Sequence, residues 1–297
     1  SDVSISSYKE NFKGALSFVS VDKTDGTMEI AFQIQTPGIN FDLSRAGKGS
    51  SHGWFFFSSY NTEQANTLLE VNASKNDKDF ILAVNWKKAE EYIKAGKGKK
   101  ISNLKYAHNR YDEATHTATS EIKAEVLQLN AADFQDLCYF IPCPKSPHGV
   151  DVDPTGEYIV GSGKLAALIP VFSFTKFQKA IADKTFEGDY EGIPVIKYES
   201  VLHGEVQKAG LGPLHTEFDG KGNAYTSFYV SSELVKWRIE DLKVLDHAPT
   251  YYAVGHLMIP GGDTKTPDAR YAVAFNKITK DRFLPTGPEL SQSAQLY

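Results

Sequence analysis

The chain has 297 residues, with 32 Lys and Arg residues against 37 Asp and Glu residues, and a net charge of −5. This mildly acidic balance, without a basic stripe, argues against nucleic acid as a partner. The sequence contains no apolar run of about 18 residues, the length that a membrane-spanning helix requires, so no membrane span is predicted.

Hairpin patterns dominate the beginning of the chain. Residues 16–21 and 28–34 are predicted to form two strands joined by an Asp-Gly turn at 22–26. Aromatic and β-branched runs at 54–60 and 80–86 predict two buried strands. Further runs of this kind follow between turn clusters, so the sequence predicts an all-β fold.

A second pattern, a strand that runs directly into a short helix, recurs at 84–93, 171–181 and 235–242. Many short strands in degenerate repeats are typical of a β-propeller. Because a blade takes roughly 40–50 residues, the chain would hold about four to six blades with short helical insertions. The chain starts at Ser1 and ends at Tyr297 directly after an apparent loop. We therefore expect a partial propeller, with further sequence on either side.

Three histidines, His148, His215 and His256, each open a segment of the same kind: a histidine, a polar turn and a short β-rich run. In a propeller, the same position in the inner strands of successive blades converges on the hub. Imidazole is a ligand for copper, zinc, iron and nickel. The repeat therefore predicts a metal site, although histidines satisfied within loops or the core are the competing interpretation.

These residues resemble the copper-ligand motifs of the nitrous oxide reductases. The resemblance is carried by Ser-Pro-His-Gly at 146–149, Gly-Leu-Gly-Pro-Leu-His-Thr-Glu-Phe-Asp-Gly at 210–220, Gly-His-Leu at 255–257 and Phe-Asn-Lys-Ile-Thr-Lys-Asp-Arg-Phe-Leu at 275–284. It extends from about Gly14 to the last residue. It implies that residues 1–297 are part of an N-terminal seven-bladed propeller, and that the family's C-terminal cupredoxin-like domain is absent from this chain.

The resemblance implies a catalytic copper centre. In that family the propeller hub holds a four-copper, sulfide-bridged cluster bound by seven histidines. His148, His215 and His256 match the fourth, fifth and sixth of these ligands, and the other four would lie in flanking sequence. Lys277 matches a lysine beside the open edge of the cluster, where it would hold charge or supply protons. A lysine paired with a hub carboxylate is the alternative.

The resemblance also implies a calcium site. Tyr60 and Glu63 match the family's motif, Asp79 matches the next acidic ligand, and Val71 matches a ligand that contributes its backbone carbonyl. Hard oxygen ligands of this kind suit calcium. Ser146 departs from the pattern, since the family usually has asparagine at this place.

The implied activity is the two-electron reduction of nitrous oxide to dinitrogen and water in denitrification, by a periplasmic homodimeric oxidoreductase. Electrons would come from a cytochrome c or a cupredoxin, through a dinuclear copper centre in the absent domain. Because the chain has three of the seven cluster ligands, we expect it to be inactive in isolation.

Two other functions remain open from the residues alone. A calcium-dependent hydrolytic propeller would use Asp, Glu and His around a hub and bind no copper. A non-catalytic interaction propeller would bind no transition metal, and its three histidines could be replaced without loss of partner binding.

Four carboxylates close in sequence to the histidines are candidates to anchor their second ring nitrogens: Asp151, Asp153, Glu217 and Asp219. The two cysteines, Cys138 and Cys143, match no common metal or redox spacing. We expect two buried thiols, and a disulfide between them stays open.

Overall fold

The computed structural model describes residues 13–62, 78–112, 117–276 and 294–297, with the backbone alone at 60–62, 78, 102–112 and 117–124. Strands dominate it, in agreement with the all-β prediction. The chain divides into two compact units, the first formed by Ser1–Gly38 and Lys87–Leu137, the second by Ile39–Trp86 and Cys138–Tyr297.

The first unit is built on one four-stranded sheet in the order β1-β2-β7-β6. Its elements are β1 (Gly14–Val21), β2 (Met28–Thr36), β6 (Lys99–Asp112), β7 (Thr117–Asn130) and the 3-10 turn η3 (Ala131–Asp133), with most of α2 (Trp86–Lys94). The predicted N-terminal hairpin is confirmed: β1 pairs antiparallel with β2, and Gly26 takes a positive φ of 78° in the turn.

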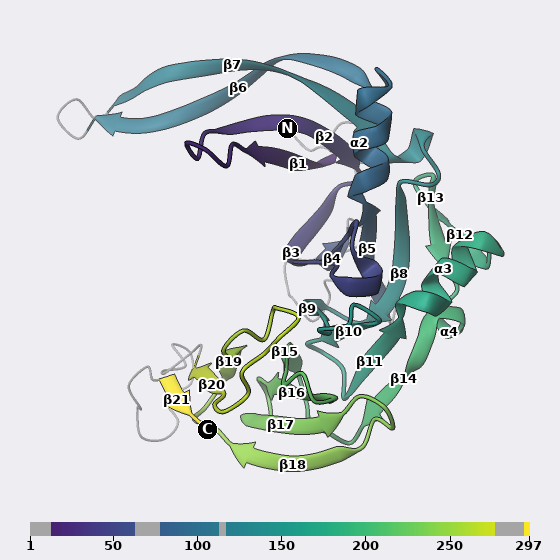
Figure 1. Ribbon diagram of the computed structural model, residues 1–297, viewed down its shortest axis with the longest axis vertical. Helices are drawn as coiled ribbons and strands as arrows, with labels where there is room; N and C mark the ends of the chain where they lie inside the picture. The colour runs from purple at the N-terminus through teal and green to yellow at the C-terminus, as the bar shows by residue number, and fades with distance from the viewer. Residues whose placement is uncertain (1–12, 63–77, 113–116, 277–293) are drawn as a thin grey trace, which may run out of the picture. The chain divides into compact units, whose positions relative to one another are not determined.

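The second unit contains four successive sheets (Figure 1). The first, in the order β12-β13-β8-β5-β4-β3, contains β3 (Ile39–Ala46), β4 (Trp54–Thr62), β5 (Lys78–Asn85), β8 (Cys138–Pro144), β12 (Phe186–Tyr190) and β13 (Ile193–Ile196). The second, β14-β11-β10-β9, contains β9 (Pro147–Val152), β10 (Tyr158–Gly163), β11 (Leu168–Ser173) and β14 (Leu202–Gln207).

The third sheet, β15-β16-β17-β18, contains β15 (Pro213–Phe218), β16 (Asn223–Phe228), β17 (Glu233–Arg238) and β18 (Val244–Pro249). The fourth contains β19 (Val254–Met258), β20 (Val273–Asn276) and β21 (Ala294–Leu296). Short helices complete the unit: η1 (Gly49–Ser51), α3 (Phe174–Ala182) and α4 (Tyr198–Val201). Successive, mostly antiparallel sheets of this kind confirm the propeller architecture.

The inner strands of the second unit are β3, β9, β15 and β19, each the terminal strand of its sheet. Strand β9 packs against both β3 and β15, and β15 packs against β19. Figure 1 shows the four strands on the inner side of the successive sheets. They form the hub, so residues on them are brought together from distant parts of the sequence.

Apolar layers between neighbouring sheets fix the spacing of the inner strands. Phe56, Phe172 and Phe177 are fully buried in the layer between the first two sheets. Phe228 and Trp237 belong to the next layer, between the second and third sheets. Burial of each such side chain contributes roughly 2–3 kcal/mol. These layers therefore hold the hub in place from outside.

Two of the three predicted strand-to-helix segments are confirmed: α2 directly follows β5, and α3 directly follows β11. The third, at 235–242, is wrong, because β17 ends at Arg238 and the chain turns back into β18. The Arg238 amide donates to the Lys243 carbonyl. The Asp241 carboxylate accepts hydrogen bonds from the Arg238 side chain and the Lys243 amide. These local bonds stabilise a hairpin turn. The segment with a helical pattern is too short to form a helix in its place.

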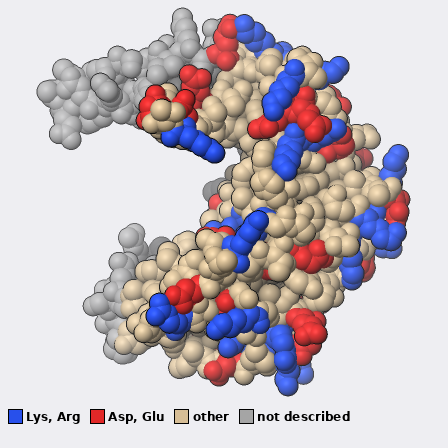
Figure 2. Space-filling view, in the orientation of Figure 1, with Lys and Arg blue, Asp and Glu red and all other residues tan. Residues whose placement is uncertain are grey.

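No helix in the described part of the chain is both long and apolar enough to cross a membrane. On the face shown in Figure 2, acidic and basic side chains are interspersed rather than gathered by sign. This distribution agrees with the mild net charge of −5.

Candidate metal centre

The three repeat histidines lie on three neighbouring inner strands: His148 on β9, His215 on β15 and His256 on β19. The ring centroids of His148 and His215 are 4.8 Å apart, and those of His215 and His256 are 4.5 Å apart. The centroids of His148 and His256 are 6.4 Å apart. The convergence that the repeat predicts is thus observed. The His148 and His215 side chains are buried, whereas His256 is exposed.

A register irregularity occurs at each of these positions. The pairing of β9 with β10 shifts across His148, and that of β15 with β16 shifts between Pro213 and Thr216. The pairing of β19 with β20 shifts between Val254 and Leu257, around His256. β-Bulges re-aim side chains and are frequent beside functional sites. They explain how all three imidazoles turn toward the hub.

Strand β3 has the same feature, and there the residue is an aspartate. Its register with β4 shifts between Phe41 and Ser44, which brackets Asp42. The Asp42 carboxylate is hydrogen-bonded to Nδ1 of His148. Asp42 is therefore the acceptor that holds this imidazole. Sequence reasoning missed it, because Asp42 precedes His148 by 106 positions and carries no local motif.

In a neutral His148 ring, the Asp42 contact favours the tautomer that carries its proton on Nδ1. With the proton of Nδ1 donated to the carboxylate, Nε2 presents its lone pair. That Nε2 lies 3.1 Å from Nε2 of His215. The two nitrogens are within hydrogen-bond distance, a spacing close to the roughly 3.3 Å between two nitrogens bound to one tetrahedral ion at about 2.0 Å.

Close backbone approach brings β9 and β15 together beside the rings. A Cβ atom built on Gly149 would lie 2.0 Å from the Leu214 carbonyl oxygen, so only glycine fits after His148. The Ser58 hydroxyl donates to the His148 carbonyl at 2.7 Å, and the Ser227 hydroxyl donates to the Gly255 carbonyl at 2.6 Å. These contacts fix the backbone beside His148 and His256.

A charged layer follows the histidines along the same strands. Nε of Arg45 donates to Asp151 at 2.9 Å and Nη1 donates to Asp263 at 2.9 Å, while Nη2 lies 3.5 Å from Glu217. Burial raises the pKa of Asp151, an effect that Arg45 partly opposes. Burial, with the negative charges of Asp263 and Asp151, raises the pKa of Glu217 to about 8.

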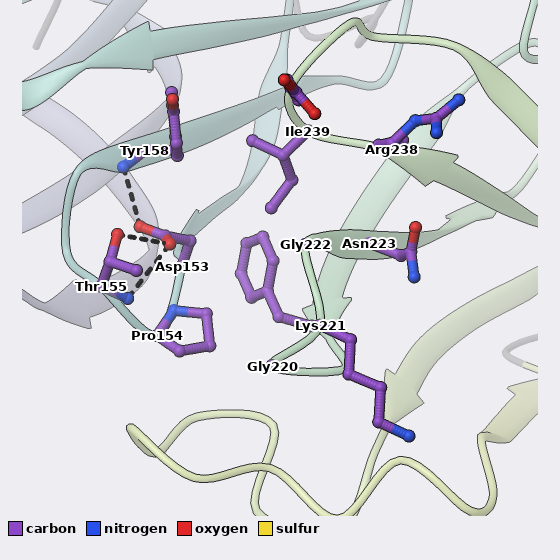
Figure 3. A pocket seen from close by; sticks show the side chains of 12 residues that line it. Asp153, Pro154, Thr155, Tyr158, Gly220, Lys221, Gly222, Asn223, Arg238 and Ile239 are labelled. Carbon is purple, nitrogen blue, oxygen red and sulfur yellow. Dashed lines mark hydrogen bonds between the residues drawn. The ribbon is translucent and has the colours of Figure 1, made fainter.

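The four candidate anchors predicted from sequence have other partners. Asp151 and Glu217 face Arg45. Asp153 caps its own turn, with its carboxylate accepting from the Thr155 amide and hydroxyl and from the Tyr158 amide. Figure 3 shows these bonds at the edge of a pocket of about 230 Å³ between the second and third sheets. Asp219 likewise accepts from the Lys221 and Asn223 amides.

The predicted calcium ligands are described only in part. Asp79 is buried on β5 and accepts a hydrogen bond from the Ser146 amide at 2.9 Å. The buried Ser146 hydroxyl has no hydrogen-bond partner among the described residues. Tyr60 lies in β4 and its side chain is not described, and Glu63 and Val71 lie outside the described residues, as does Lys277.

Both cysteines are free and buried, as expected. Cys138 and Cys143 lie on the fully buried strand β8. Burial raises the pKa of both thiols far above the ordinary value, and the negative charge of Asp79 adds to this for Cys143. Neither thiol is prepared for metal binding or redox chemistry.

Within the described ranges, no three His, Cys, Asp or Glu side chains stand ready, as placed, to hold a metal ion. The donor chemistry nevertheless fits a copper or zinc site, since three imidazoles meet and one is oriented by a carboxylate. The hub thus gathers three imidazoles, which are nitrogen donors of the kind that such a site uses.

Comparisons with known proteins point to the same family as the sequence resemblance. The family profile described as "Nitrous oxide reductase propeller repeat" matches residues 247–297. The nitrous-oxide reductase of Stutzerimonas stutzeri is 29% identical over 91% of this chain and 39% of its own length. That of Ralstonia nicotianae is 30% identical over 88% of this chain and 38% of its own length. These matches confirm the resemblance to the propeller region of nitrous oxide reductase.

The chain spans 39% of the Stutzerimonas relative, so the similarity concerns one region of a longer protein. Among solved structures, the hydrazine synthase of Kuenenia stuttgartiensis matches with a TM-score of 0.43 and 10% identity, over 93% of this chain and 49% of that chain. A similarity that weak carries no argument about function.

Proposed function

We propose that this chain is the part of a nitrous oxide reductase propeller that supplies three imidazole ligands, His148, His215 and His256, to the catalytic copper centre. The observation that carries the proposal is their convergence from three successive inner strands, with ring centroids 4.5–6.4 Å apart. Imidazole is a good copper ligand, and Asp42 orients His148 as carboxylates orient metal-bound histidines.

The reaction is the reduction of nitrous oxide with two electrons and two protons, which yields dinitrogen and water. The copper-sulfide cluster, when bound, supplies the electrons. The residues of this chain hold the ligands in fixed geometry and bury two of the three rings away from water. Lys277, close in sequence to β20, would hold a proton for the departing oxygen.

Other parts of the enzyme complete this scheme. Four further histidines would come from sequence flanking this chain. A cupredoxin-like domain with a dinuclear copper centre would deliver the electrons, received from a cytochrome c or a cupredoxin. We place the enzyme in the periplasm as a homodimer, by analogy with the family.

We also propose that Asp79 and Ser146 form part of a calcium site with Tyr60, Glu63 and the Val71 carbonyl. The buried Ser146 hydroxyl, without a hydrogen-bond partner among the described residues, is an oxygen that a cation would satisfy. Serine at this place would then replace the family's asparagine as an oxygen donor.

The test uses the whole protein, with whatever sequence flanks this chain in the cell. His148→Ala, His215→Ala and His256→Ala are each expected to lower copper content and to abolish nitrous oxide consumption with a chemical reductant. His247→Ala, whose ring pairs with Glu233 on the surface, is the matched control and should change neither. Full copper content in all three hub variants would overturn the proposal. Calcium without copper in the purified protein would instead favour a hydrolytic propeller.

A further inference from the structure

One side chain contacts two of the strands that carry a hub histidine and the loop that follows the third. Arg45, on β3, reaches Asp151 on β9, Glu217 on β15 and Asp263 in the loop after β19. Asp151 follows His148 by three residues, and Glu217 follows His215 by two. The guanidinium therefore contacts β9, β15 and the loop after β19, two to seven residues beyond the hub histidines in the chain.

The layer is joined by further bonds that make it a unit. The second oxygen of Asp151 accepts the Thr216 amide at 2.8 Å, which ties β9 directly to the residue after His215. Lys48 donates to the Asp263 carbonyl at 2.7 Å, so the loop after β19 is held by its backbone as well as its side chain. Gly262 in that loop packs so closely on Glu217 that a Cβ atom would lie 1.9 Å from its carboxylate oxygen.

An arginine suits this layer better than a lysine. Asp151 and Glu217 are almost fully buried, whereas Arg45 is 30% exposed. A planar guanidinium presents several donors in fixed directions, whereas lysine is a single flexible point charge. Removing the cation would leave the buried Asp151 carboxylate without an opposite charge beside it, which is destabilising.

We propose that Arg45 is a positioning residue for the histidine centre, because it fixes the relative placement of β9, β15 and the loop after β19. This inference rests on the proposed copper function. The contacts of Arg45 with Asp151, Glu217 and Asp263, here called the Arg45 clamp, are nevertheless a property of the metal-free protein. Asp151 lies three residues after His148 on β9, and Glu217 lies two residues after His215 on β15. A shift of β9 along β15 would therefore separate the two rings together with the two carboxylates.

The experiment compares Arg45→Met and Arg45→Lys with Arg238→Met in the whole protein. Arg238 is an exposed arginine paired with Asp241 in the β17–β18 turn, so it controls for loss of a surface ion pair. Amide hydrogen exchange of the metal-free proteins is followed by mass spectrometry. Arg45→Met should exchange at least about tenfold faster at 147–152, 213–218 and 259–268. The exchange rates of Arg45→Lys in these segments should lie between those of Arg45→Met and the unmodified protein. The exchange rates of Arg238→Met should equal those of the unmodified protein.

Copper(I) affinity of the same metal-free proteins, measured by competition with a chromogenic chelator, is the second readout. We expect about a tenfold loss for Arg45→Met, the scale on which outer contacts tune metal sites. If Arg45→Met does not fold, Arg45→Lys decides the question. Unchanged hydrogen exchange in β9 and β15 of the Arg45 variants would show that Arg45 does not hold these strands. Faster exchange with unchanged copper affinity would show that Arg45 does not position the histidines. Failure of the unmodified protein to bind copper would instead reject the proposed function. The hydrogen-exchange rates alone would then show whether Arg45 holds the three segments together.

Discussion

At the scale of single residues, the hydrogen bond between Asp42 and His148 defines the chemistry of the hub. A carboxylate on Nδ1 makes His148 present Nε2 to the interior, 3.1 Å from Nε2 of His215. Strands β9, β15 and β19 each have a histidine at the point where their pairing register shifts. Strand β3 has Asp42 at the corresponding shift. The inner strand without a histidine thus supplies, at the equivalent position, the carboxylate that orients His148.

Replacement of Asp42 by asparagine should weaken copper binding with little effect on folding. The amide can donate as well as accept, so it no longer enforces the tautomer that exposes Nε2. We expect a loss of about 10–100-fold in copper(I) affinity, measured by chelator competition on the whole protein. Asp246→Asn, an exposed aspartate beside His247, is the control. Equal affinities of the two variants would contradict the role given to Asp42.

The cysteines allow a second test at this scale. Because burial raises the pKa of the Cys138 and Cys143 thiols, neither forms the reactive thiolate at pH 8. An aromatic disulfide reagent should therefore leave both unmodified in the native protein and titrate both in denaturant. Rapid native reaction of either thiol would show that β8 is not buried as described.

At the scale of elements, a buried chain of hydrogen bonds ties the strand of His215 to its sheet. The Trp237 indole on β17 donates to the Thr226 hydroxyl on β16 at 2.9 Å. That hydroxyl lies 2.8 Å from the hydroxyl of Thr216 on β15. Three of the four strands of this sheet, β15, β16 and β17, are thus joined through Thr226, and Thr216 directly follows His215.

Thr226→Val should destabilise the protein by about 2 kcal/mol, because it leaves two buried polar groups without their partner. The measurement is the free energy of unfolding from denaturant titration. Thr226→Ser, which keeps the hydroxyl, should recover most of the loss. Thr250→Val, at a less buried hydroxyl that bonds only its neighbour's carbonyl among the described residues, should stay within about 0.5 kcal/mol of the unmodified protein. A Thr226→Val variant as stable as this control would contradict the account.

Local patterns predicted the elements better than the contacts between them. The N-terminal hairpin, the buried strands and two of the strand-to-helix segments follow from residues adjacent in sequence, and the repeat position predicted the meeting of the three histidines. Asp42 and Arg45 could not be predicted, because their partners lie more than 100 positions away. The carboxylates chosen as anchors were near the histidines in sequence, but strand direction carries them away from the rings.

At the scale of the whole molecule, the hub belongs to one of the two units. The gathered imidazoles, Asp42 and the Arg45 layer lie entirely within Ile39–Trp86 and Cys138–Tyr297. Asp79 and Ser146 lie in the same unit, where their contact joins β5 to the turn just before His148. A cation bound there would therefore brace the segment that leads into the hub.

Calcium removal should lower the stability of the whole protein. A ligand that binds only the folded state adds about 2.7 kcal/mol at 100 times its dissociation constant. We expect a calcium chelator to lower the thermal midpoint, and added calcium to restore it. Asp79→Asn should lose this response, whereas Asp189→Asn, at an exposed aspartate on β12, should keep it. A midpoint independent of calcium in the unmodified protein would contradict the calcium proposal.

The most direct test of the copper proposal is anomalous X-ray diffraction at the copper absorption edge, from crystals of the whole copper-loaded protein. We predict a copper peak within bonding distance, about 2 Å, of ring nitrogens of His148, His215 and His256. Copper bound elsewhere in the protein, with no anomalous peak between these three rings, would contradict the account.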